Sequence, residues 1–146
     1  MKYRWLLLAM CVLVLSGCKT PEVNLKSALL KNLTASRLDV GLNLDVFNPN
    51  EYELPIQQVD WSLDLFNSRF NDGSVALKRN IPAARRVGVE VPLGIAFNAV
   101  AVGVQNILTK RSIPWGIDGG VAFRTPAGPV RADFGSMGQW ANPLLR

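Results

Sequence analysis

Residues 37–47 read RLDVGLNLDVF, and this stretch decides the fold because apolar and polar side chains alternate through it without a break. The apolar residues take every second position from Leu38 to Val46, and polar residues or glycine take the positions between them. Successive side chains of a β-strand point to opposite faces, so a period of two predicts a strand with one buried and one solvated face.

The same alternation recurs along the chain, at 59–65, 87–97, 115–123 and 130–134. Residues 23–34 are ambiguous in this respect, and we expect them to form an opening strand. Pro92 removes a backbone donor, which predicts an edge strand or a bulge for 87–97. Two segments predict turns between short strands, Asn67-Ser68 and Asn71-Asp72-Gly73.

One segment departs from this pattern. Between 99 and 110 the apolar positions fall at helical spacing, with Asn98 as the expected cap. The last residues, 136–146, are predicted to be an irregular tail. About seven short strands with frequent turns predict an all-β fold, an antiparallel β-sandwich of immunoglobulin or fibronectin type III kind with one short helix.

The first 17 residues differ in kind from the rest. Lys2 and Arg4 precede an apolar run from Trp5 to Leu15, after which small residues lead to Cys18. Charge, apolar stretch and small residues in this order are typical of a secretory signal. The run is too short to span a bilayer, which takes about 20 residues. We therefore expect residues 1–17 to be a signal peptide.

Leu15-Ser16-Gly17-Cys18 resembles the lipobox of bacterial lipoproteins at every position. The resemblance implies a diacylglycerol on the Cys18 thiol, cleavage before Cys18 and acylation of the new amino terminus, which leaves 18–22 as an acylated tether. Two or more acyl chains hold a protein firmly on a membrane. In such lipoproteins an aspartate after the cysteine tends to retain the protein in the inner membrane. Lys19 therefore implies the outer membrane, with the domain facing the periplasm.

Composition excludes several kinds of site. The chain has no histidine, Cys11 lies in the predicted signal and Cys18 would be acylated, so nucleophile–histidine pairs and histidine zinc sites are excluded. The net charge of +5 is spread along the chain and does not predict nucleic-acid binding. We expect no enzyme activity, no cofactor and no metal. Four aspartates occupy polar positions of predicted strands, which favours a solvated sheet face over a calcium or acid–base site: Asp39, Asp45, Asp60 and Asp64.

After the strand at 37–47 the chain continues as Asn48-Pro49-Asn50, then Leu54-Pro55-Ile56, and later contains Ile81-Pro82 and Val91-Pro92-Leu93. Over residues 23–135 this set resembles the type 2 late-embryogenesis-abundant (LEA) family, whose module is called the WHy domain. The resemblance implies a seven-stranded sandwich with one helix, no cofactor and no known catalytic residue. It also implies an association with desiccation and stress tolerance and, for some relatives, lipid binding between sheet and helix.

The Asn48-Pro49-Asn50 motif has a structural interpretation. A residue before proline avoids helical angles, so Asn48 stays extended, and Pro49 stops ladder pairing. Asn50 would tolerate left-handed angles. These features favour a strand-ending turn, and a recognition loop is the alternative.

Two functions fit the sequence. The first is a stress-protective or scaffolding module at the cell envelope that binds client proteins. The second is a carrier or sensor for a lipid or other apolar ligand, held in a cavity lined by Val104, Leu108 and the strand that contains Trp115.

Overall fold

The computed structural model describes residues 17–98 and 104–146, in which seven strands form two antiparallel sheets. The strands are β1 (Glu22–Leu33), β2 (Arg37–Phe47), β3 (Leu54–Leu65), β4 (Ser68–Ile81), β5 (Arg86–Ala96), β6 (Ser112–Thr125) and β7 (Gly128–Ala141). One sheet has the order β1-β2-β5 and the other β4-β3-β6-β7. A short helix, α2 (Val104–Thr109), precedes β6, and a 3-10 helix, η2 (Pro143–Leu145), follows β7. The predicted seven-stranded antiparallel sandwich with one short helix is confirmed.

The core lies between the two sheets and follows the alternation seen in the sequence. The inward positions of β2 and β5 are buried from Leu38 to Val46 and from Val89 to Ile95, and they face the inward positions of β3 and β6. Side chains from two inner faces interdigitate in this way in aligned sandwiches. Among the described residues, the core extends from Val23 to Trp140.

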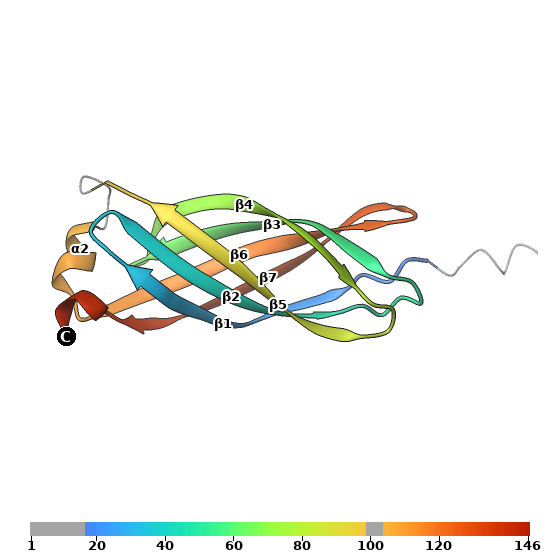
Figure 1. The fold of residues 1–146 in the computed structure, drawn as a ribbon, viewed down its shortest axis with the longest axis horizontal. Helices are drawn as coiled ribbons and strands as arrows, with labels where there is room; N and C mark the ends of the chain where they lie inside the picture. The colour runs from blue at the N-terminus through green and yellow to red at the C-terminus, as the bar shows by residue number, and fades with distance from the viewer. Residues whose placement is uncertain (1–16, 99–103) are drawn as a thin grey trace, which may run out of the picture.

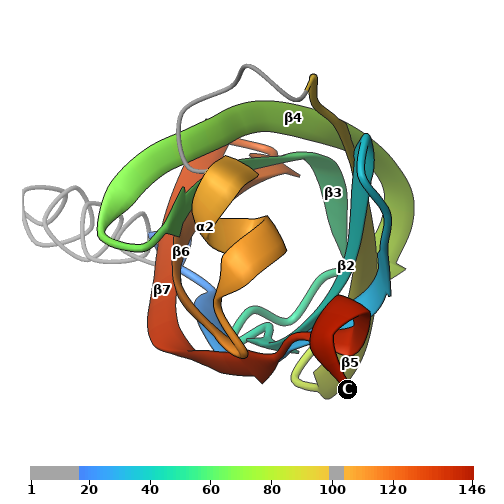
Figure 2. The same cartoon turned by 90° about the vertical axis from the view of Figure 1, so that its left-hand side faces the viewer.

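All strands run along one long axis, so the connections gather at two ends (Figure 1). We call one end the base, formed by residues 17–21, 48–53, 82–85 and 126–127. The opposite end is the tip, formed by 34–36, 66–67, 97–98, 104–111 and 142–146. Figure 2 looks onto the tip, where α2 lies over the end of the sandwich with Val104 and Ile107 buried.

Two predictions about the ends of strands are wrong. Asn71-Asp72-Gly73 is not a turn, because β4 runs through it, and the hairpin turn consists of Phe66 and Asn67 with φ of 51° and 62°. Two successive residues with positive φ match the twist of a tight hairpin. The tail over 136–146 is not irregular, because β7 continues to Ala141 and buries Trp140 before η2 begins.

The remaining predictions concern Pro92, the helix over 99–110 and the signal peptide. Pro92 lies in β5, an edge strand of its sheet, and the pairing of β5 with β2 has no irregularity. The helix expected over 99–110 is present at 104–109, and its first part, 99–103, lies outside the described residues. The predicted signal peptide also lies outside them except for Gly17.

Candidate functional site

The Asn48-Pro49-Asn50 motif lies at the base, where the chain leaves β2 in one sheet for β3 in the other. Asn48 is fully buried, and its Nδ2 donates to the carbonyl oxygens of Tyr52 at 2.7 Å, Ile81 at 3.1 Å and Pro82 at 3.2 Å. Its backbone N–H donates to the carbonyl oxygen of Arg85 at 2.9 Å. The Asn48 carboxamide therefore joins the β2–β3 crossover to the β4–β5 crossover.

The side chain of Asn50 reaches a segment that is far away in sequence. Its Oδ1 accepts the backbone N–H of Lys19 at 2.8 Å, and its Nδ2 donates to the carbonyl oxygen of Lys19 at 2.8 Å. We call this pair of hydrogen bonds the Lys19 clamp. The backbone N–H of Asn50 donates in turn to Oδ1 of Asn48 at 3.0 Å. The motif therefore fixes the backbone of the residue that directly follows Cys18.

The predicted left-handed conformation of Asn50 is wrong. Among the described residues, the non-glycine residues with positive φ are Phe66, Asn67 and Ala84. An asparagine fits position 50 because its carboxamide offers one acceptor and one donor side by side, which matches a backbone C=O and N–H.

Cys18 lies at the surface of the base, half-buried, next to Tyr52. A hydrogen bond with Cys18 raises the pKa of the Tyr52 phenol above its ordinary value, and desolvation raises it further. The Cys18 sulfur is not part of the core. A group attached to it can therefore extend away from the domain without disturbing the packing.

At the tip, a buried asparagine, Asn142, makes similar hydrogen bonds to backbone groups, and the sequence analysis did not predict this role. Asn142 is buried after β7 and before Pro143, and its Nδ2 donates to the carbonyl oxygens of Ile107 at 2.6 Å and Lys110 at 2.8 Å. Its Oδ1 accepts the N–H of Leu144 at 3.0 Å. Asn142 thereby holds α2 and η2 together. The signal in the sequence is an Asn-Pro pair after an alternating stretch, as at Asn48.

The four aspartates of the predicted solvated faces are dispersed, and each pairs with a cation. Asp39 pairs with Arg37 at 2.8 Å, Asp45 with Arg86 at 2.7 Å, Asp64 with Arg69 at 2.6 Å and Asp60 with Arg131. Hydrogen bonds from Gln58 and Arg131 lower the pKa of Asp60. In residues 17–98 and 104–146, no three side chains of Cys, His, Asp or Glu converge as metal ligands would. Within the same ranges, no helix has the length and apolar character needed to cross a bilayer.

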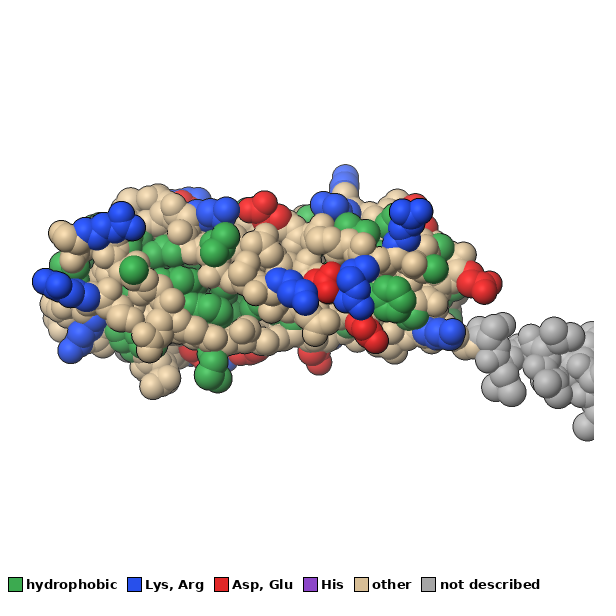
Figure 3. Space-filling view, turned by 90° about the horizontal axis from the view of Figure 1, so that it is seen from below, with side chains coloured by type: hydrophobic (Ala, Val, Ile, Leu, Met, Phe, Trp, Pro, Cys, Tyr) green, Lys and Arg blue, Asp and Glu red, His purple; other side chains and the backbone are tan. Residues whose placement is uncertain are grey.

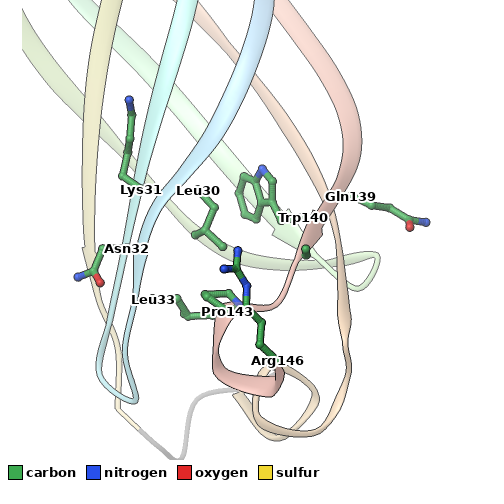
Figure 4. A pocket seen from close by; sticks show the side chains of 9 residues that line it. Leu30, Lys31, Asn32, Leu33, Gln139, Trp140, Pro143 and Arg146 are labelled. Carbon is green, nitrogen blue, oxygen red and sulfur yellow. The ribbon is translucent and has the colours of Figure 1, made fainter.

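A groove of about 460 Å³ lies at the tip between β1 and β7 (Figure 4). Leu30, Leu33, Trp140 and Pro143 form its apolar part, and the side chain of Arg146 points toward Leu30 and Trp140. We call it the tip groove. The tip groove is not the cavity predicted between the helix and the sheet, because the tip groove lies between β1 and β7.

Leu108 is 44% exposed and faces away from the core, so the expectation that it lines such a cavity is wrong. Val104 and Ile107 are the residues of α2 that are buried. Spacing alone could not separate Leu108 from Ile107, because the two are adjacent in a helix of only six residues.

Solved structures share this fold. An Arabidopsis thaliana protein determined in solution is 15% identical, with a TM-score of 0.70 over 88% of this chain and 85% of that chain. A protein described as late embryogenesis abundant is 20% identical, with a TM-score of 0.67 over 99% of this chain and 81% of that chain. A protein from Archaeoglobus fulgidus, known from a crystal structure, is 11% identical, with a TM-score of 0.60 over 88% of this chain and 100% of that chain. At such identities the likeness shows the fold alone.

Sequence comparison goes further than the fold. No curated protein matches the chain. The family model of late embryogenesis abundant proteins, however, matches residues 43–136, a range that includes Asn48-Pro49-Asn50 and extends from β2 into β7. The chain therefore belongs to the late embryogenesis abundant protein family, in its type 2 branch.

Proposed function

We propose that the protein is a lipoprotein whose LEA domain is held at a membrane by acyl chains on Cys18 and protects envelope components during drying or osmotic stress. The domain acts by binding or exclusion at its surface and not by catalysis. The lysine after Cys18 favours the outer membrane, with the domain in the periplasm.

The observation that carries this proposal is the Lys19 clamp. The two hydrogen bonds from Asn50 hold the chain one residue beyond Cys18, and Pro21 is buried two residues later. The chain is thus held to the domain from the residue directly after Cys18, which supports cleavage before Cys18 and an acyl anchor close to the folded surface.

Replacement of Cys18 with Ser tests the anchor. The variant should leave the domain folded, because the Cys18 sulfur is outside the core, and it should move from the membrane to the soluble fraction or accumulate as precursor. A variant that still sediments with membranes after washes with high salt and carbonate would contradict the proposal.

Replacement of Lys19 with Asp tests the choice of membrane. Asn50 binds the backbone of Lys19, so the substitution should not change the melting temperature. The protein should move from the outer to the inner membrane fraction on a sucrose gradient. An unchanged distribution would contradict the outer-membrane assignment and leave the acyl anchor untouched.

The protective role is tested by drying. A strain without the gene should grow normally and survive drying or osmotic shock less well. The purified domain should reduce aggregation of a labile enzyme through cycles of drying, at about equal mass and without ATP. An unrelated β-sandwich of similar size and charge is the control, because any added protein crowds the solution. Equal protection by both proteins would contradict a specific role.

The tip groove favours a second candidate function, the carriage of an apolar ligand with an anionic end. Leu30, Leu33 and Trp140 would contact the apolar part, and Arg146 would pair with the charge. Native mass spectrometry of the domain purified from its own host tests this candidate. A lipid bound in a 1:1 ratio, and lost in a Trp140→Ala variant that is still folded, would favour the carrier over the protective module.

A further inference from the structure

A second hollow lies near the base, at the edge of the four-stranded sheet that β4 forms. Its volume is about 830 Å³, and its lining includes Gln57, Leu77, Lys78, Arg79 and Arg124. We call it the basal groove. The residues come from β3, β4 and β6, at the ends of these strands that lie toward the base (Figure 1).

An irregularity in the sheet accompanies the groove. The pairing of β3 with β4 passes from Ile56↔Arg79 to Gln58↔Ala76, so Leu77 and Lys78 lie opposite Gln57 alone. Where two residues of one strand lie opposite a single residue of its partner, the strand with the extra residue bends and its side chains change direction. Beside this bulge, Lys78 and Arg79 line the hollow from the edge strand β4, and Arg124 lines it from β6.

The cations of the basal groove have no carboxylate partner. Within the described residues, no ion pair includes Lys78, Arg79 or Arg124, whereas the arginines of the sheet faces pair with aspartates. With its amide oxygen toward Arg124, Gln57 accepts from the guanidinium at 3.2 Å from Nη2 and 3.3 Å from Nε. Arg124 is thus held in place by a neutral group and keeps its charge available.

The groove lies close to the proposed anchor. Asn48, which supports the Lys19 clamp through Asn50, also binds the carbonyl oxygen of Ile81 at 3.1 Å, and Arg79 is two residues from Ile81. At about 3.3 Å per residue, Arg79 lies roughly 7 Å from the end of β4. The headgroup layer of a bilayer is about 5–7 Å deep on each side. When the base of the domain enters this layer, the groove therefore lies within reach of the headgroup phosphates.

We infer that the basal groove binds the phosphate of an anionic lipid headgroup in the leaflet that the acyl chains of Cys18 enter. Arginine forks suit phosphate oxygens, and lysine adds a point charge. Leu77 and Pro55, both partly buried, offer apolar contact to the glycerol part of the lipid. The inference rests on the proposed anchor, which supplies the membrane.

The test uses residues 18–146 with Cys18 replaced by Ser, so that no acyl chain contributes. The probes are sucrose-loaded vesicles of phosphatidylcholine, alone or with 30 mol% phosphatidylglycerol. The domain should sediment with the anionic vesicles only. K78Q/R79Q/R124Q should weaken this binding at least 10-fold, because each cation near an anionic surface contributes about 5-fold.

The chain offers a matched control at its other end. R37Q/K110Q/R111Q removes the same charge from the tip, at residues outside both grooves, and should change binding less than 3-fold. K78R/R79K/R124K keeps the charge of the groove and should bind as the parent does, with circular dichroism melting to show that each variant is folded. Equal losses in the groove and tip variants, or equal binding to both kinds of vesicle, would overturn the inference.

Titration with inorganic phosphate separates two sources of the same chemistry. Saturable binding of phosphate without binding to anionic vesicles would overturn the assignment of a lipid. The Cys18→Ser fractionation in cells is independent of these results, because the vesicle test involves no acyl group. Failure of the vesicle test would therefore not contradict the acyl anchor, and failure of the Cys18→Ser test would not contradict lipid binding by the groove.

Discussion

Several strand positions require glycine because a neighbouring group leaves no room for a Cβ atom, and not because of their backbone angles. A Cβ on Gly119 would lie 2.0 Å from the carbonyl oxygen of Asp60. A Cβ on Gly138 would lie 2.7 Å from the indole of Trp115, which belongs to the neighbouring strand. The same relation holds between Gly73 and Trp61, at 3.0 Å. In these strands, glycine allows a large group of the adjacent strand to lie close against the backbone.

Replacement of Gly119 with Ala should destabilise the domain by about 3 kcal/mol or more, because the obstacle is backbone and cannot rotate away. Gly88→Ala is the matched control, since nothing lies within 4 Å of its Cβ position. The control should be neutral or stabilise by about 0.4–1 kcal/mol. Urea unfolding at pH 7 measures both changes, and equal midpoints for the two variants would contradict the argument.

Replacement of Asn50 with Ala should cost about 1–3 kcal/mol, because it leaves the backbone N–H and C=O of Lys19 without their side-chain partners and removes one of the two hydrogen bonds to Oδ1 of Asn48. Hydrogen exchange at the Lys19 amide should also become faster, while exchange in β2 and β3 should not. Asn32→Ala removes one exposed hydrogen bond and is the control. Slow exchange of Lys19 in the Asn50 variant would show that the clamp does not hold the tether.

At the scale of elements, β1 is an edge strand that is protected from pairing with other chains. Its register with β2 slips at Lys26 and at Lys31. Lys26 reaches Asp45 at 3.7 Å, and Lys31 reaches Glu90 on β5 at 3.6 Å. Bulges and lysines on an edge both oppose strand addition.

Replacement of both lysines with Val should leave the melting temperature nearly unchanged, because exposed ion pairs contribute little to stability. The variant should instead form dimers and larger species as concentration rises, which sedimentation velocity detects. The control is Lys110→Val with Arg111→Val, which removes the same charge beside α2. This variant should have the same sedimentation profile as the parent. If the edge variant shows the same sedimentation profile as the parent at every concentration, the two lysines have no protective role.

Residues with clear alternation were predictable, and those whose environment depends on distant contacts were not. β2 and β5 bury one face each, so their period of two is visible in the sequence. β4 is an edge strand that is exposed on most of its length, and its Asn-Asp-Gly therefore resembles a turn. The Lys19 clamp joins residues 31 apart, and the basal groove unites Lys78 with Arg124 across two strands, so no local pattern reveals either.

At the scale of the whole molecule, the two ends differ in charge. Figure 3 shows lysines and arginines along the whole face, mixed with aspartates and glutamates toward the middle and the base and without them at the end of the tip. The described residues of the tip include Lys110, Arg111 and Arg146 and contain no Asp or Glu. A domain that stands on its base presents this basic end to whatever lies away from the membrane.

The proposed anchor predicts a domain that stands upright on its base, and this orientation can be measured on the acylated protein in vesicles. A cysteine introduced at Ala127, in the base, should carry a fluorophore that a headgroup spin label quenches strongly. A cysteine at Leu108, at the tip, should escape quenching, because strands of 14 residues at about 3.3 Å per residue separate the ends by roughly 40 Å. Equal quenching at both positions would mean that the domain lies flat.

The positions of the two ends of the chain determine how the domain responds to tension. β1 begins at the base next to the clamped Lys19, and β7 ends at the tip (Figure 1). A pull between an acylated Cys18 and a load attached after η2 therefore acts along these strands, perpendicular to the ladder hydrogen bonds that join β1 to β2 and β6 to β7. Under such shear many hydrogen bonds resist together instead of opening one after another. Under the proposed function, the fold suits a mechanical link that stays intact when a drying envelope shrinks and strains it.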